Sequence, residues 1–253
     1  MKSSIERRAE IFKLLQLQGS MRVEALAQYF QVSTVTIRND LNILEKHGHI
    51  TRSHGYAILN SRLISELSIS DKHNNYPELK QRIGKVAASL LTNNERIILD
   101  SGTTTKAIVS YLDNLHLTVL TNGLDIAMEL VSCPNVEVRL TGGVLRKNAM
   151  SFSGVTADDH LRQYRFDKVF LGVDGFDLQR GITTFNEQEA HLNRLMCNAA
   201  EQVIVVADSS KFGQHSNFVI CDVHQIDKLV TDDQIPQQYR EALENSGVEV
   251  LIA

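Results

Sequence analysis

The stretch ILDSGTTT, residues 98–105, decides the fold of the larger part of this chain. Ile97, Ile98 and Leu99 lead directly into Asp100 and a Ser-Gly-Thr-Thr-Thr run, a pattern typical of a buried strand followed by a helix N-terminus. Such a terminus presents free backbone N–H groups and the positive end of a helix dipole, which suit a phosphate or carboxylate. An ordinary strand–turn–helix joint with hydroxyl caps explains the stretch equally well, so its surroundings must decide.

Short apolar runs alternate with helical patterns along the rest of this region. Beyond 97–99, strands are predicted at 117–120, 136–140, 168–173, 203–207, 218–220, 228–230 and 248–252. Helices are predicted from Pro77 to residue 91 and near 103–113, 123–132, 187–200 and 236–245. Alternation of helices with near-continuous apolar strands predicts an α/β domain with a mainly parallel sheet.

Polar clusters follow several of the predicted strands and supply hydroxyls, glycine amides, carboxylates and one cation. Ligands of an open α/β sheet bind beyond the carboxyl ends of its strands, so the clusters are expected to converge on one rim. Their chemistry suits a phosphorylated sugar or polyol. The candidate effector-binding residues are Asp100, Ser101, Gly102, Thr103, Thr104, Thr105, Asn122, Gly142, Gly143, Asp174, Asn186, Glu187 and Lys211.

The first 57 residues differ from the rest in charge, with +3 against −7 for the remainder. A capping box at Ser3 and Glu6 opens a first helix that ends at Gly19, and a short second helix is predicted around 26–30. Ser33 is a suitable N-cap for a third helix from residue 34 to 47. Residues 49–59 then predict a basic hairpin. Three short helices and a basic hairpin indicate a winged helix-turn-helix.

The third predicted helix has an apolar side, formed by Ile37, Leu41 and Leu44, and a polar side that could meet the DNA major groove. The basic hairpin could contact the DNA backbone or the minor groove. A small helical docking domain with a solvated polar face is the alternative. The candidate DNA-binding residues are Ser33, Thr34, Val35, Thr36, Arg38, Asn39, Asn42, Lys46, Arg52 and His54.

Two sets of motifs resemble those of the DeoR-type bacterial sugar-catabolism repressors. Residues 6–55, with VSTVTIRNDL at 32–41, resemble the winged helix of that family, although Asn39 and Tyr56 replace a usual basic residue and a usual glycine. The motifs LDSGTTT, TNG, TGG, LGVDG, ITTFNEQE and DSSKF follow the family order in the effector domain. That resemblance implies a fold similar to ribose-5-phosphate isomerase and glucosamine-6-phosphate deaminase, a phosphate cradle at 100–105, and the amino-sugar or galactitol branch.

The expected organisation is a winged helix-turn-helix at 1–59, a linker at 60–76 and an effector and oligomerisation domain at 77–253. The expected function is an operator-binding repressor that a phosphorylated sugar releases, acting as a homo-oligomer, a dimer or tetramer, in the cytoplasm. A sugar-phosphate isomerase or deaminase with an accessory DNA-binding module is the alternative. Dinucleotide and P-loop motifs and zinc-type Cys/His spacings do not occur, nor does a long apolar segment, so no cofactor, metal or membrane is expected.

Overall fold

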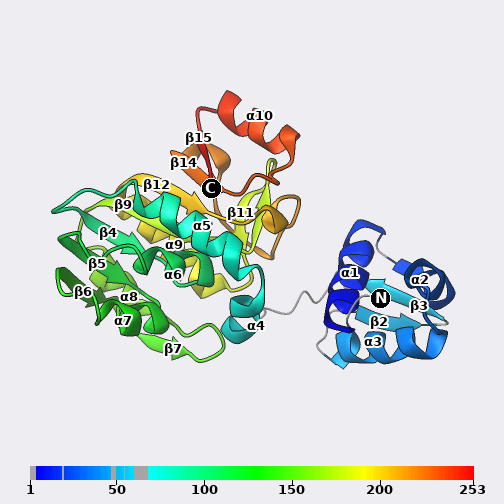
Figure 1. Ribbon diagram of the computed structural model, residues 1–253. Helices are drawn as coiled ribbons and strands as arrows, with labels where there is room; N and C mark the ends of the chain where they lie inside the picture. The colour runs from blue at the N-terminus through cyan, green and yellow to red at the C-terminus, as the bar shows by residue number, and fades with distance from the viewer. Residues whose placement is uncertain (1–3, 19, 47–49, 54, 60–67) are drawn as a thin grey trace. The chain divides into compact units, whose positions relative to one another are not determined.

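The computed structural model describes residues 4–18, 20–46, 50–53, 55–59 and 68–253 (Figure 1). The chain divides into two compact units, residues 1–66 and 67–253, each of which is described by itself.

The N-terminal unit is a winged helix-turn-helix, as the sequence predicts. Its helices are α1 (Ser4–Gln18), α2 (Val23–Phe30) and α3 (Thr34–Lys46). Its strands β1 (Ser20–Arg22), β2 (Ile50–Ser53) and β3 (Tyr56–Leu59) form an antiparallel sheet in the order β1–β3–β2. Strand β1 was not predicted, because three residues are too few to show an alternating pattern.

An apolar core and a buried ion pair hold α3 in this unit. Ile37, Leu41 and Leu44 of α3 are buried in the core, on the side that the sequence predicts. Asp40, only 3% exposed, accepts a hydrogen bond from Arg7 Nε of α1 at 2.6 Å. Breaking such a buried pair by removing one partner typically costs about 3–5 kcal/mol. Part of the basic charge of the unit therefore orients α3 and is not displayed on its surface.

The C-terminal unit is built on a seven-stranded parallel sheet, which confirms the predicted α/β architecture. In sheet order its strands are β15 (Glu249–Ile252), β14 (Lys228–Thr231), β12 (Ala200–Val206), β9 (Phe166–Gly172), β4 (Arg96–Leu99), β5 (Leu117–Thr121) and β6 (Val136–Leu140). Helices cover both faces (Figure 1), so both faces of the strands are apolar.

Two core clusters show which helices cover which face. The face that buries Ile97 and Leu99 is covered by α5 (Pro77–Ala88), α6 (Thr103–Val109) and α7 (Leu124–Leu130). The face that buries Ile98 is covered by α8 (Val155–Leu161), α9 (Glu187–Ala199) and α10 (Gln237–Asn245). The chain thus leaves β4 toward one face through α6, whereas α9, which leads into β12, lies on the other.

Two small antiparallel sheets lie outside the parallel one. One pairs β7 (Val144–Arg146) with β8 (Ser151–Ser153), and the other has the order β10 (Gly175–Asp177), β11 (Gly181–Thr184), β13 (Phe218–Cys221). The predicted strand at 218–220 is therefore a strand of the small sheet and not of the parallel one. Its four residues carry no sequence signal for strand direction.

The structure also shortens the expected linker at residues 60–76. Residues 68–76 lie in the C-terminal unit and include the helix α4 (Ile69–Asn74), capped by Ser68. A six-residue helix rich in polar side chains shows no clear apolar period, so the sequence indicated a partial helix within a linker but not its bounds. Residues 60–67 lie outside the described part of the chain.

Gly84 determines how closely α5 approaches α6. A Cβ atom at position 84 would lie 2.6 Å from the backbone carbonyl of Ala107, a separation that real Cβ contacts do not show. We therefore expect Gly84→Ala to destabilise the C-terminal unit by about 1–3 kcal/mol through overpacking, although alanine is the better helix former. Urea unfolding followed by circular dichroism measures this.

Lys85→Ala is the matched control, because Lys85 is exposed on the same helix. Its effect should stay within about 0.5 kcal/mol. Equal stability of Gly84→Ala and the native chain would contradict the close approach of α5 and α6.

Candidate functional site

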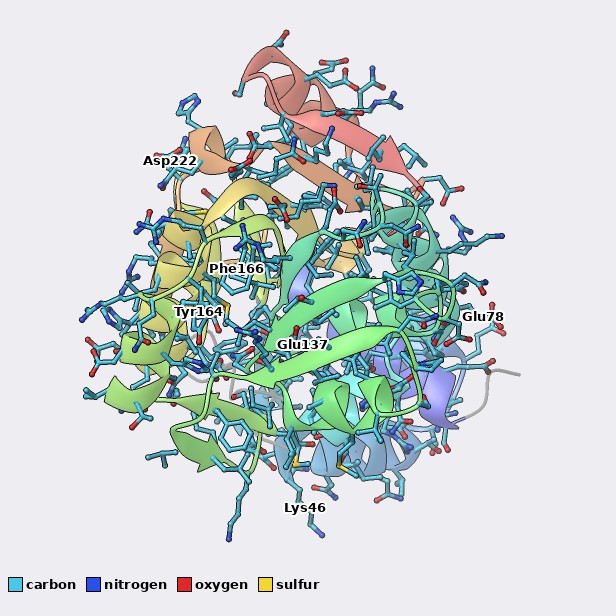
Figure 2. The ribbon with its side chains drawn as sticks, turned by 90° about the vertical axis from the view of Figure 1, so that its left-hand side faces the viewer. Lys46, Glu78, Glu137, Tyr164, Phe166 and Asp222 are labelled. Atoms are coloured by element: carbon cyan, nitrogen blue, oxygen red, sulfur yellow. The ribbon has the colours of Figure 1, made fainter. Side chains whose placement is uncertain are left out.

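The outer surface of α3 displays most of the residues predicted to contact DNA. Arg38, Asn39 and Lys46 are exposed, and Val35 is 62% exposed, whereas Asn42 is half-buried. Figure 2 shows the side chain of Lys46 extending away from the ribbon. Guanidinium, amide and small apolar groups on one helix face match the edges of bases in a major groove.

Two predicted DNA-binding hydroxyls also cap α3. The hydroxyl of Ser33 accepts a hydrogen bond from the backbone N–H of Thr36 at 3.1 Å, and the two hydroxyl oxygens lie 2.9 Å apart. Thr34 is half-buried in the first turn. These residues therefore fix where the helix begins, which places the exposed side chains after them.

Two polar contacts tie the wing strands to α3 and to β1. Arg52 pairs with Glu45 of α3, with 2.7 Å between Nε and Oε2, so it is engaged within the unit and is not displayed as a lone cation. The Cζ atom of Arg22 lies 5.2 Å from the ring centre of Tyr56. Nε of Arg22 also donates a hydrogen bond to the hydroxyl of Tyr56. His54, the other predicted wing contact, lies outside the described residues.

In the C-terminal unit a cavity of about 90 Å³ opens beyond the carboxyl ends of β4 and β9. This volume is several times what one water molecule needs. The strand order shows that β4 and β9 are neighbours although β5 to β8 come between them in the chain. Such a switch in strand order is where open α/β sheets form their ligand crevices.

The predicted cradle lies at this crevice. Asp100, Ser101, Gly102, Thr103 and Thr104 line the cavity, and Gly102 precedes α6 with φ of 148°. Thr105 is buried outside the lining, and its hydroxyl donates to the carbonyl of Gly102 at 2.9 Å. Its role is therefore to hold the cradle rather than to face a ligand.

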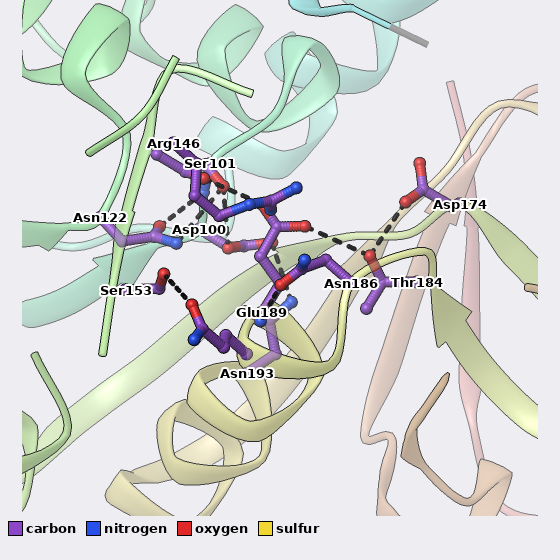
Figure 3. Close-up of polar contacts among 12 residues, drawn as sticks. Asp100, Ser101, Asn122, Arg146, Ser153, Asp174, Thr184, Asn186, Glu189 and Asn193 are labelled. Carbon is purple, nitrogen blue, oxygen red and sulfur yellow. Dashed lines mark hydrogen bonds and ion pairs between the residues drawn. The ribbon is translucent and has the colours of Figure 1, made fainter. Parts of the chain in front are cut away.

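Asn122, Gly142 and Gly143 do not belong to the described lining. Asn122 is fully buried, and its side-chain oxygen accepts a hydrogen bond from the N–H of Ser101 at 2.7 Å, so it supports the cradle from behind (Figure 3). A Cβ atom at Gly143 would lie 2.5 Å from the carbonyl oxygen of Ser153, which makes this glycine a packing requirement between β7 and β8.

The carboxylate that lines the cavity is Glu189 and not the predicted Glu187. Glu187 is exposed at the start of α9, whereas Glu189, two residues later, is 9% exposed and lines the cavity. Asn186 caps α9 by accepting a hydrogen bond from the N–H of Glu189 at 3.1 Å and is itself outside the lining. The helical turn set by this cap directs position 189 inward, and the motif ITTFNEQE alone does not distinguish the two glutamates.

Lysines form the part of the site that the sequence analysis missed. Besides the predicted Lys211, the cavity is lined by Lys72 of α4 and Lys80 of α5. Lys80 is 6% exposed, and burial lowers its pKa to about 8, with the charges of Lys211 and Lys72 acting in the same direction and Asp208 opposing them. Three cations gathered from three elements at one cavity favour an anionic ligand.

The carboxylates of the site are held in two different states. Burial and the nearby charge of Glu189 raise the pKa of Asp100 well above its usual value. Burial alone would raise the pKa of Asp174 as well, but Lys72 and Lys211 outweigh it and hold that pKa below its usual value. Asp174 is thus favoured as an anion, whereas the surroundings of Asp100 disfavour its charged form.

Hydrogen bonds and an ion pair hold the carboxylates of the cavity in place (Figure 3). The hydroxyl of Thr184 lies 3.0 Å from Oδ2 of Asp174 and 3.4 Å from Oε2 of Glu189. Glu189 also pairs with Arg146 of β7, and the amide of Asn193 lies 3.4 Å from Asp100. Rigid acceptors and donors of this kind suit the hydroxyl groups of a sugar or polyol.

Comparisons with known proteins agree with both units. A family model described as the DeoR-like helix-turn-helix domain matches residues 7–63, and one described as the DeoR C terminal sensor domain matches residues 75–233. The chain belongs to the DeoR family. The two family models together match most of the chain, and this confirms the resemblance that the motifs indicate.

Two relatives match this DeoR-family chain over nearly its whole length. One, named putative aga operon transcriptional repressor, from Escherichia coli O157:H7, is 43% identical over 98% of this chain and 93% of its own. Another, named HTH-type transcriptional repressor GlcR, from Bacillus subtilis (strain 168), is 34% identical over 98% and 95%. The chain is therefore a DNA-binding transcriptional regulator, and the alternative of a sugar-phosphate isomerase or deaminase is set aside.

Among solved structures, ribose 5-phosphate isomerase A from Methanocaldococcus jannaschii aligns with 55% of each chain at 16% identity and a TM-score of 0.41. This likeness is too weak to carry an inference. In the described part of the regulator no cluster of His, Cys, Asp or Glu could hold a metal ion. None of the helices described is long and apolar enough to cross a membrane.

The lowered pKa of Lys80 predicts a pH-dependent cost in stability. A lysine with a pKa of about 8 in the folded chain and 10.5 when unfolded destabilises the fold while it is charged. The cost is full below about pH 8 and vanishes as the pH rises through 10.5. Lys80→Met should therefore increase the free energy of unfolding of the ligand-free regulator at pH 7 by at most about 3 kcal/mol. This corresponds to a rise in Tm of several degrees at pH 7 and to a smaller rise at pH 9.5.

Differential scanning calorimetry at the two pH values provides the measurement. Lys85→Met, on the exposed side of the same helix, should show no such pH-dependent gain. A Lys80→Met variant that is less stable than the native chain at pH 7 would contradict the cost assigned to this buried charge.

Proposed function

We propose that this regulator represses a carbohydrate catabolic operon, for amino sugars or sugar alcohols, and that a phosphorylated sugar bound in the C-terminal cavity releases it from its operator. The observation that carries the proposal is the meeting of three lysines with the hydroxyl-rich cradle at the crevice between β4 and β9. The names of the two relatives, which refer to repressors, support the direction of control.

The phosphate end of the effector fits the side of the cavity formed by the cradle and the lysines. Ser101, Thr103 and Thr104 offer hydroxyls, Thr103 and Thr104 also offer backbone N–H groups, and Lys80 and Lys211 offer ammonium groups. A phosphate with about two negative charges at neutral pH would offset the repulsion among the lysines. In doing so it would also restore the pKa of Lys80 toward its usual value, so binding would take up a fraction of a proton near pH 8.

The hydroxyl groups of the effector fit the carboxylate side of the cavity. Asp174, Glu189 and Asn193 are positioned by hydrogen bonds to their neighbours and line the cavity with polar atoms. Fixed acceptors discriminate strongly against a ligand that lacks the matching hydroxyl, because a buried polar group is then left unpaired. This side would therefore distinguish one phosphorylated sugar from another.

The DNA-binding unit is proposed to act through α3, with Arg38, Asn39, Asn42 and Lys46 toward the major groove and Val35 toward a thymine methyl group. A homo-oligomer would present several such helices to repeated half-sites on operator DNA. To act as a switch, the effector must bind the DNA-free arrangement more tightly than the DNA-bound one.

Arg38→Ala should weaken binding to the operator by roughly 1–3 kcal/mol, because a guanidinium that reads a base edge contributes this much to discrimination. Fluorescence anisotropy with a duplex from the promoter region of the regulator's own gene, against a scrambled duplex, measures the change. Arg162→Ala, which removes the same charge from the C-terminal unit, is the control. Unchanged operator affinity in Arg38→Ala would rule out base contact by this residue.

A thermal-shift panel tests the effector. Hexose, hexosamine and hexitol phosphates are compared with their unphosphorylated counterparts on the full chain. A phosphorylated member at about 100 times its Kd should stabilise by about 2.7 kcal/mol, and its unphosphorylated form should give no shift. Lys80→Met should remove most of the shift and Lys85→Met should keep it. Equal shifts with and without phosphate would contradict the assignment of the lysine side.

A further inference from the structure

Helix α4 follows the DNA-binding unit in the chain and forms part of the effector cavity. Residues 60–67 separate the end of β3 from Ser68, which caps α4. The cavity is lined by Ile69 and Lys72 of α4 and by Asn75 and Tyr76, which follow it. The first described helix after the covalent connection to the DNA-binding unit thus lines the effector cavity.

Local contacts make α4 a defined element rather than a loose connection. The hydroxyl of Ser68 accepts a hydrogen bond from the N–H of Asp71 at 3.2 Å and donates to its carboxylate at 2.7 Å. The N–H of Ile69 donates to the carbonyl of Asn148 at 2.9 Å. His73 Nε2 lies 3.5 Å from a carboxylate oxygen of Asp125 on α7.

The strongest charged contact of α4 lies inside the cavity. Lys72 Nζ donates to Oδ1 of Asp174 at 2.7 Å, and the two side chains are only 23% and 10% exposed. Lys80 of α5 donates to the backbone carbonyl of Lys72. The ammonium group of Lys72 therefore holds α4 to the segment after β9. It also faces the space in which an anionic effector would lie.

An anion in the cavity would compete with Asp174 for this ammonium group. Charge-assisted hydrogen bonds are the strong ones in a protein interior, and a lysine holds its partner as a point charge without the fixed geometry of an arginine. An effector phosphate can thus replace Asp174 as the partner of Lys72, because it offers the ammonium group another anion in the same cavity while the charge of Lys211 still acts on Asp174. Because α4 is short and carries Lys72 at its middle, a change of partner changes how its N-terminal end is held.

We propose that Lys72 is an effector-binding residue and that exchange of its ion pair with Asp174 for one with the effector is the step that transmits binding through α4 to the DNA-binding unit. This inference rests on the proposed function of the cavity. Lys72 differs in this respect from Lys80 and Lys211, because the elements that carry those two lysines come later in the chain than α4 and do not directly follow the connection to the DNA-binding unit. Those two lysines hold the effector, whereas Lys72 both holds it and reports it.

The test separates binding from transmission by measuring operator affinity at saturating effector. The probes are inorganic phosphate and the phosphorylated sugar that gives the largest thermal shift in the panel. For the native chain, the saturating sugar phosphate should raise the operator Kd by at least about tenfold, within the usual range of allosteric coupling. In Lys72→Met this ratio should fall below about threefold even at saturation, which is confirmed by raising the effector concentration until the operator Kd no longer changes.

Three further variants give the result its meaning. Lys80→Met lines the same cavity and should need more effector but recover the full ratio at saturation. Lys72→Arg keeps the charge and should restore at least part of the ratio. Asp174→Asn removes the carboxylate from the ion pair with Lys72, so it should raise the operator Kd without any effector. The Tm and the circular dichroism spectrum of each ligand-free variant show that it is folded.

The outcomes separate this inference from the proposed function. If Lys72→Met reaches the ratio of the native chain at saturation, or if Lys80→Met loses the ratio to the same extent, transmission through Lys72 is wrong while the effector site stands. If no phosphorylated sugar shifts the Tm of the native chain, the proposed function fails and the inference fails with it. A low ratio confined to Lys72→Met and Asp174→Asn supports the inference.

Discussion

The divergence of the chain at the neighbouring strands β4 and β9 is the constraint on which the rest of the C-terminal unit depends. After β4 the chain crosses to the face covered by α6, and after β9 it reaches α9 on the opposite face. Two connections that part in this way leave a crevice at the strand ends. The cradle at 100–104 and the segment at 172–174 line it because these residues immediately follow the two strands.

Charge concentrated in this crevice explains why the site is both costly and selective. Burial lowers the pKa of Lys80 and raises that of Asp100, so each group resists its charged form in the absence of a ligand. The protein accepts this cost because preorganised charges and dipoles bind a complementary ligand without further rearrangement. An effector phosphate would lower the repulsion among the lysines, while the carboxylate side would select among sugars.

The N-terminal unit follows the same principle with different means. Its core and the Arg7–Asp40 pair fix α3, so that the exposed residues of that helix need no rearrangement to enter a groove. Asp40 and Arg52 illustrate that a charged residue in a DNA-binding sequence can serve the unit internally. Helix α4, which is the first described helix after the DNA-binding unit in the chain, lines the cavity of the C-terminal unit.

Local sequence determined the elements whose signal is carried by neighbouring residues. The apolar run before Asp100, the cap of α3 and the strands β5 and β6 were predictable because apolar period and capping chemistry act within a few residues. The short strands β1, β7, β8, β10 and β11 were not, since their stability comes from pairing and packing with distant segments.

The composition of the site was decided only in the tertiary structure. Six motifs predicted one shared rim, but the position along α9 brings Glu189 into the cavity and leaves Glu187 exposed. Asn122 and Thr105 do not line the cavity and instead form hydrogen bonds to Ser101 and Gly102. Lys72 and Lys80 carry no motif, and they enter the cavity because the packing of α5 on α6, allowed by Gly84, and the contacts of α4 bring them there. The sequence thus determined the family, the fold and the strand–loop–helix stretch at 97–105, while long-range packing determined which cations and carboxylates line the cavity.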